Sequence, residues 1–167
     1  AIALGADVVA IGTATLLALG CHLCQSCHTG KCSWGLTTQK PELTRRVDPE
    51  WGADRLTNLV HAWSHELQEI LGATYRLLVK THVHHWNVVG PLFHPIHVMT
   101  EAQYEDLFAA TDTLAERIRA LGRPTAAPKI GTEPGSTAKM SVEKMVEDLV
   151  ADTEALVRMM RDAAEAA

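Results

Sequence analysis

Five side chains that could ligate a metal lie between residues 85 and 116, at intervals of 12, 4, 11 and 4 residues. They are His85, His97, Glu101, Asp112 and Glu116. At about 100° per residue, the last four form a stripe about 100° wide on one helix. Imidazole together with several carboxylates suits iron or manganese in a helical bundle. The pattern therefore predicts a metal site on one face of a long helix.

One helix cannot close this site by itself. At about 1.5 Å rise per residue, His97 and Glu116 lie roughly 28 Å apart along the axis. Antiparallel pairing with a second copy would place His97 and Glu101 of one chain opposite Asp112 and Glu116 of the other. The spacing therefore predicts a symmetric dimer with two metal sites across its interface.

The residues around these ligands resemble the Dps mini-ferritins. The family signature K-T-H-x-x-H-W-N-x-x-G-P occupies residues 80–91, and A-E-R-I-R-A-L-G occupies 115–122. The resemblance covers about residues 73–167 and lacks the last core helix. It implies that His85, His97, Glu101, Asp112 and Glu116 are the ferroxidase ligands.

The activity that this resemblance implies is iron oxidation and storage. Fe(II) would bind between subunits, be oxidised by hydrogen peroxide or dioxygen, and be stored as Fe(III) in a hollow shell. The homo-oligomer would be at least a two-fold dimer, with a dodecamer as the family's larger assembly.

A second group of possible ligands lies near the start of the chain. All four cysteines, Cys21, Cys24, Cys27 and Cys32, fall within twelve residues. Such close spacing favours an iron–sulfur or zinc site over a disulfide framework. Reduced thiols without a metal are the remaining alternative.

This N-terminal stretch resembles another family, glutamate synthase. The matching runs are A-I-A-L-G-A-D-V-V-A-I-G-T at 1–13, G-C-H-L-C-Q-S-C-H-T-G-K-C at 20–32 and G-L-T-T-Q at 35–39. Over about residues 1–72 they are similar to the C-terminal end of its FMN and iron–sulfur domain. The resemblance implies that Cys21, Cys27 and Cys32 hold a [3Fe–4S] cluster. A barrel of that type typically needs about 250 residues, so glutamate synthesis by this chain is not expected.

Composition bounds the remaining possibilities. The chain has 167 residues, 47% hydrophobic residues and a net charge of −5. No Lys/Arg-rich tail is present, so DNA binding, which needs cations against phosphate, gains no support. The apolar residues 1–20 lack a basic leading region and contain glycines, which argues against a signal peptide or a membrane span. A cytoplasmic protein is expected.

Hydrophobic periodicity predicts a mainly α, ferritin-like helical bundle. Long helices are expected at about 50–84, 96–121 and 141–166, and an extended connector at 33–50. Residues 1–50 should form a Cys-rich segment, and residues 51–167 the bundle. The expected fourth core helix is missing, so an apolar groove should remain exposed. Whether the chain is a fragment or a fusion stays open.

Some polar residues are expected to have no chemical role. His84 is predicted to lie at the surface, and the acidic run of Glu143, Glu147 and Asp148 to form a solvated face. The rival to the ferroxidase is an iron–sulfur module for electron transfer or structure, derived from glutamate synthase. A recombinant product with neither activity is the third reading.

Overall fold

A computed structural model describes residues 11–129 and 140–165 of the chain, and these residues contain helices but no strand. The chain divides into two compact units, and the boundary between them falls between Trp63 and Ser64. The described elements are α1 (Thr13–Ala18), the 3-10 helix η2 (Cys27–Thr29), α2 (Pro41–Thr44), α3 (Pro49–Asn87), α4 (Phe93–Ala120) and α5 (Val142–Glu165).

The three long helices match the sequence prediction closely. α3 extends three residues beyond the expected end, α4 begins three residues early, and α5 agrees within one residue at each end. The mainly α prediction is therefore confirmed. The connector predicted at 33–50 is interrupted by α2, where Pro41 at the first helical position fits the helix start.

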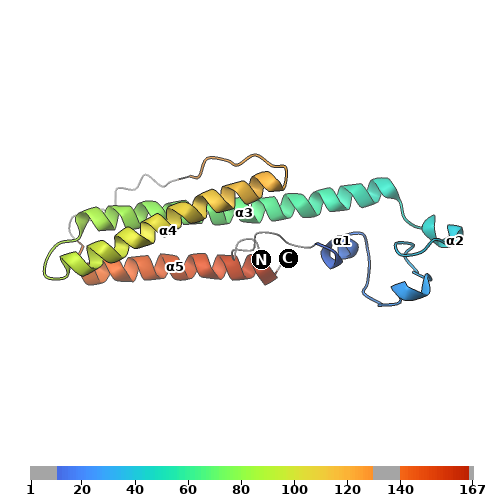
Figure 1. The fold of residues 1–167 in the computed structure, drawn as a ribbon, viewed down its shortest axis with the longest axis horizontal. Helices are drawn as coiled ribbons and strands as arrows, with labels where there is room; N and C mark the ends of the chain where they lie inside the picture. Colours follow the sequence, from blue (N-terminus) through green and yellow to red (C-terminus); the bar gives the residue numbers. More distant parts are fainter. Residues whose placement is uncertain (1–10, 130–139, 166–167) are drawn as a thin grey trace. The chain divides into compact units, whose positions relative to one another are not determined.

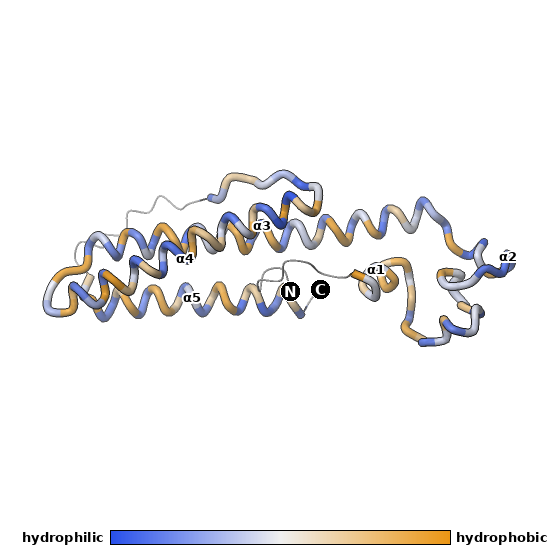
Figure 2. The backbone as a smooth tube through the Cα atoms, in the orientation of Figure 1, coloured by the Kyte–Doolittle hydropathy of each residue, from blue (hydrophilic) through white to orange (hydrophobic). Residues whose placement is uncertain are grey.

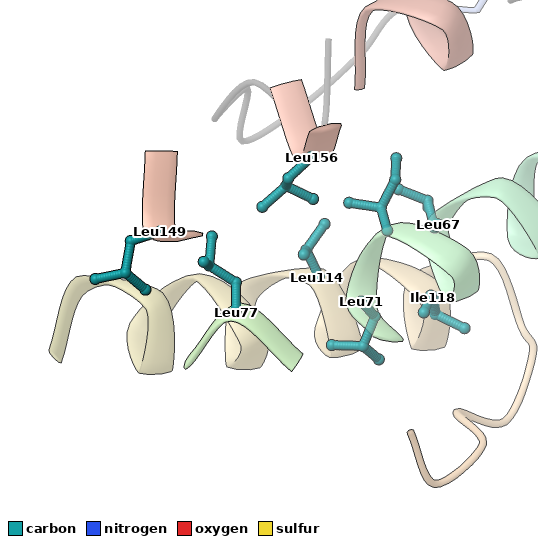
Figure 3. Close-up of a cluster of buried hydrophobic side chains, with 8 residues drawn as sticks. Leu67, Leu71, Leu77, Leu114, Ile118, Leu149 and Leu156 are labelled. Carbon is teal, nitrogen blue, oxygen red and sulfur yellow. The ribbon is translucent and has the colours of Figure 1, made fainter. Parts of the chain in front are cut away.

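The C-terminal unit is built by α4, α5 and the part of α3 from Ser64 onward, which run side by side in Figure 1. Hydrophobic segments recur along α5 in Figure 2, as expected for one apolar stripe. Leucine and isoleucine side chains from all three helices meet in one cluster, shown in Figure 3. Its members are Leu67, Ile70, Leu71, Leu77, Leu114, Ile118, Leu149 and Leu156.

Buried threonines lie between these apolar layers without leaving a hydroxyl unpaired. Thr74 Oγ1 donates to the Ile70 carbonyl at 2.8 Å, and Thr81 Oγ1 donates to the Leu77 carbonyl at 2.8 Å. Each bond satisfies the hydroxyl within its own helix, so burial carries little penalty.

An open groove runs between α4 and α5. Apolar side chains of Met99, Val146, Val150 and Val157 line it, with Arg158 at its border. The sequence predicts such an exposed apolar surface for an arrangement of three helices. Within residues 11–129 and 140–165, no helix is long and apolar enough to cross a membrane.

A polar network joins α3 to α5 and corrects one prediction. His84 is 1% exposed rather than superficial, and its Nε2–H donates to Asp148 Oδ2 at 2.8 Å. Lys80 Nζ lies 3.0 Å from Asp148 Oδ1 and 2.5 Å from Asp152 Oδ2. Asp148 therefore pairs with α3 and is not part of a solvated acidic face.

The network shifts two pKa values. Burial raises the pKa of Asp148, but hydrogen bonds from His84 and Lys80 outweigh burial, and the pKa lies below its usual range. Burial lowers the pKa of Lys80, yet the bonds to Asp152 and Asp148 leave it above its usual range. The ionised pair is therefore favoured by the fold.

Removal of a core side chain tests the packing. We expect Ile70→Ala to reduce the free energy of unfolding by roughly 2–5 kcal/mol, because Ile70 is buried among three helices and its loss leaves a cavity. Chemical denaturation measures this difference. Val89→Ala is the control, since Val89 is 70% exposed and its truncation should have little effect. Equal losses for the two variants would contradict the described core.

The network predicts a pH dependence of stability. Because the folded pKa of Asp148 is depressed, its contribution is present above the unfolded pKa and is lost as pH falls through the folded pKa. We expect Asp148→Asn to cost roughly 1–3 kcal/mol near neutral pH, and the difference to shrink below about pH 4. Denaturation curves at several pH values measure it.

The matched control for this experiment is Glu154→Gln on the same helix. Glu154 pairs with Arg158 at 3.6 Å, and both side chains are 64% exposed, so little stability should depend on it. A penalty for Asp148→Asn that stays constant down to low pH would refute the predicted linkage.

Candidate metal centre

The turn between α3 and α4 brings two of the predicted ligands together. His85 lies in the last turn of α3, and His97 lies in the second turn of α4. Gly90 in the connecting loop has a φ of +97°, which a residue with a Cβ adopts only with strain. The tight reversal at Gly90 and Pro91 therefore positions the two histidines.

The histidines hold each other through reciprocal hydrogen bonds. His85 Nδ1 lies 3.0 Å from the His97 carbonyl oxygen, and His97 Nδ1 lies 3.0 Å from the His85 carbonyl oxygen. A carbonyl oxygen only accepts, so each Nδ1 carries the proton. The neutral form of either ring then has a bare lone pair on Nε2, which is the atom that a metal would take.

Ring packing fixes the orientation of this histidine pair. The His85 and His97 rings stack with centroids 3.7 Å apart, and Phe93 stacks on His97 at 4.9 Å. Thr100 is fully buried and its Oγ1 lies 3.3 Å from His85 Nδ1. His85 is itself 7% exposed. The pair is therefore preorganised within one chain.

One aromatic residue that the sequence analysis did not single out, Tyr104, completes the surroundings. Tyr104 stacks on His82 at 4.2 Å and meets His85 edge-on at 5.2 Å. Tyr104 lies seven residues after His97, which is two helical turns, so the helical period alone could have placed it beside the histidines. Its pKa is raised, first by burial and then by the negative charges of Glu101 and Glu105.

The three predicted carboxylate ligands do not join the histidines within one chain. Glu101, Asp112 and Glu116 are all exposed on α4. In the part of the chain that the structure describes, no three His, Cys, Asp or Glu side chains form a group that could hold a metal. Each chain thus presents its three predicted carboxylate ligands on the exposed side of α4, apart from the histidine pair.

The predicted cysteine ligands lie in the N-terminal unit. Cys21 is partly buried, Cys27 is exposed and Cys32 is buried, and all are free thiols. They likewise do not converge as a group of three among the described residues. The backbone between them is unusual, because Leu23 and Gln25 have φ values of 57° and 56°. Non-glycine residues adopt such values at a cost of order 1–2 kcal/mol each.

Two of these cysteine sulfurs accept hydrogen bonds from backbone amides. The Leu23 N–H donates to Cys21 Sγ at 3.4 Å. At Cys32, hydrogen bonds led by the Thr37 amide and joined by the Trp34 amide lower the pKa of the thiol to about 7, although burial opposes them. The Cys32 thiolate, which is the form that binds metals, is therefore substantially populated near neutral pH.

Known proteins match the two halves of the chain separately. The conserved region of glutamate synthase matches residues 1–76, and the ferritin-like domain matches residues 64–167. An archaeal-type glutamate synthase [NADPH] of Thermotoga neapolitana is 67% identical over 72 residues, which cover 43% of this chain and 14% of that protein. The Methanocaldococcus jannaschii archaeal glutamate synthase [NADPH] is 62% identical over 73 residues, 44% of this chain and 14% of that protein.

A further relative is a protein of another kind. An uncharacterized low temperature-induced protein of Nostoc is 40% identical over 102 residues, which cover 58% of this chain and 57% of the Nostoc protein. The chain thus spans little of the glutamate synthases and just over half of the Nostoc protein. Since the ferritin-like match covers most of the chain and the three long helices fit it, the chain belongs to the ferritin-like family.

Proposed function

We propose that this protein is a Dps-like ferroxidase that binds Fe(II) between two subunits and oxidises it for iron storage and protection against oxidative stress. The observation that carries the proposal is the reciprocal pair of histidine–carbonyl hydrogen bonds. These bonds direct the proton to Nδ1 in both rings, and the ferritin-like match makes iron the expected metal.

The ligand set accounts for the direction of the reaction. His85 and His97 would bind ferrous iron as neutral imidazoles, while Glu101, Asp112 and Glu116 would supply hard oxygen ligands that favour Fe(III). Two ferrous ions together deliver two electrons. One hydrogen peroxide then takes up both electrons and two protons and leaves as two water molecules, so no radical is released. Dioxygen is the alternative oxidant.

The proposed assembly follows from the separation of the ligands on α4. Two copies complete two sites, and further association into a dodecameric shell would enclose the ferric product. We place the activity in the cytoplasm, because four free thiols persist in a reducing compartment.

Subunit mixing tests whether the site is shared between two chains. We expect His97→Ala and Asp112→Ala to abolish fast ferrous oxidation when each variant is assayed alone. After the two are unfolded and refolded together, each mixed dimer contains one intact site. About a quarter of the wild-type rate should return if pairing is random. A ferrous-selective chelating dye measures the remaining Fe(II).

The control pairs His97→Ala with a variant that carries both substitutions. No intact site can then form in any dimer, so the rate should stay at background. Fast oxidation by either single variant alone would disprove the assigned ligands, and failure of the mixture to recover would disprove the shared site.

A second candidate function lies in the N-terminal unit. Three observations favour an iron–sulfur site there. The pKa of the Cys32 thiol is lowered, a backbone amide donates a hydrogen bond to Cys21 Sγ, and the identity to glutamate synthases is high. Thiolates with amide donors are the groups that such a cluster needs, so the donor chemistry suits a [3Fe–4S] centre. Cys21, Cys27 and Cys32 would hold it once the three thiolates draw together around the cluster. This module would serve electron transfer or structure.

Cysteine variants test this second candidate. We expect anaerobic reconstitution with iron and sulfide to give visible charge-transfer absorption in the wild type and in Cys24→Ser. Cys32→Ser should lose it, because a ligand thiolate is removed. Equal absorption in both variants would contradict the assignment of Cys32, and a wild-type chain that binds no sulfide would exclude the cluster.

A further inference from the structure

The outer face of α5 carries a second apolar stripe beside the one that faces the core. An open groove of about 680 Å³ is lined by Val146, Leu149, Val150 and Val157, together with Met99 of α4. Val150 is 50% exposed and Val157 is 39% exposed, so these side chains are left outside the core. A groove of this volume falls in the range of roughly 300–1,000 Å³ that small-molecule sites occupy.

The groove lies away from the proposed metal centre. Gln103 is the other residue of α4 that lines it. At about 100° per residue counted from His97, the ligand stripe of α4 covers roughly 0–100°, whereas Met99 and Gln103 lie at roughly 200–240°. The two surfaces therefore lie on opposite sides of α4, and a molecule in the groove leaves the predicted iron ligands uncovered.

Charged residues gather at one end of the groove. Along α5, Val146 and Val150 come first, and Glu154, Arg158 and Arg161 line the groove toward the end of the helix. Glu154 Oε2 lies 3.6 Å from Arg158 Nη1, and both side chains are well exposed, so an incoming anion can compete for Arg158. Two guanidinium groups against one carboxylate leave a net positive charge. The groove is thus an apolar trough with a cationic end.

The dimensions of the groove match one extended hydrocarbon chain. From Val146 to Arg158, α5 rises about 18 Å. An extended chain of about fourteen carbon atoms spans the same distance, given C–C bonds of about 1.5 Å. A helix about 10 Å across would occupy roughly 1,400 Å³ over that length, which is about twice the volume of the groove. The volume therefore favours a single chain over a docked helix.

We propose that the groove between α4 and α5 binds a long-chain fatty acid. Its carboxylate pairs with Arg158 and Arg161, and its acyl chain lies along the three valines of the stripe. The hydrophobic effect supplies most of the affinity through the buried methylene groups. The guanidinium groups select an anionic head group, because they bind a carboxylate through two parallel hydrogen bonds. This inference is independent of the proposed ferroxidase function, since it uses none of its ligands.

Isothermal titration calorimetry of the full chain tests the site, with saturated fatty acids kept below their critical micelle concentrations. We expect the affinity to rise roughly twofold to fourfold for each methylene added from about ten to fourteen carbons, and to level off once the chain fills the groove. Tetradecylammonium has the same chain length and a cationic head, so it should bind roughly tenfold more weakly than tetradecanoate. Equal binding of the two, or no binding of tetradecanoate, overturns the proposal.

Substitutions in α5 separate the head group from the chain. Arg161→Gln should weaken tetradecanoate binding roughly threefold to tenfold, and Val150→Asp roughly tenfold or more, because a carboxylate then faces the chain. Glu154→Gln should strengthen binding roughly twofold to fivefold, since it frees Arg158 and removes a negative charge. Glu147→Gln is the matched control, because Glu147 is exposed on the same helix but does not line the groove. Circular dichroism verifies that all four variants remain helical.

Other occupants of the groove give different results. If a second copy of this chain covers the stripe, sedimentation velocity will show a dimer that Val150→Asp dissociates and that tetradecanoate leaves unchanged. That result overturns the proposal. An affinity that depends neither on chain length nor on Arg161 and Glu154 would show nonspecific adsorption of an amphiphile, and it overturns the proposal as well.

Discussion

A straight α-helix fixes the distance between its own side chains, and the whole proposed metal centre depends on this constraint. α4 holds His97 and Glu116 about 28 Å apart along its axis, far beyond the reach of one ion. In the proposed site, both residues can serve one ion only when another molecule of the same chain supplies part of the ligand set. The exposed carboxylates on α4 are the groups that a second copy would have to approach in the proposed site.

The histidine pair meets a different demand, because its two members lie on different helices of one chain. Each ring uses the backbone of the other residue as its acceptor, so neither orientation is independent. The rings therefore act as one unit, and effects of replacing them should not add. The tight turn at Gly90 makes this mutual dependence possible by bringing the helix ends together.

Periodicity was enough to predict the three long helices and the stripe on α4, because both follow from local geometry. The burial of His84 was not predictable in that way. Its partner Asp148 is 64 residues away, and only the packing of α5 on α3 shows that a polar pair lies inside. The backbone amides that donate hydrogen bonds to Cys32 are close to it in sequence. These hydrogen bonds nevertheless depend on a loop conformation that the spacing of the cysteines does not encode. Likewise, the reciprocal histidine bonds require the turn geometry, which the motif alone leaves unspecified.

The two family matches overlap on residues 64–76, inside α3. A helix is suited to such a joint because its hydrogen bonds are local and every residue repeats the same rotation. A joint between two segments within a helix must keep the helical rotation of the side chains. Leu67 and Ile70 on the shared stretch must face the same core as Leu77 beyond it, and all three are buried in one cluster. A gene fusion that kept this rotation could join a glutamate-synthase-like segment to a ferritin-like segment without an intervening loop. An insertion or deletion of a single residue near Gly72 would turn the following face by about 100° and separate the histidines from the core that supports them.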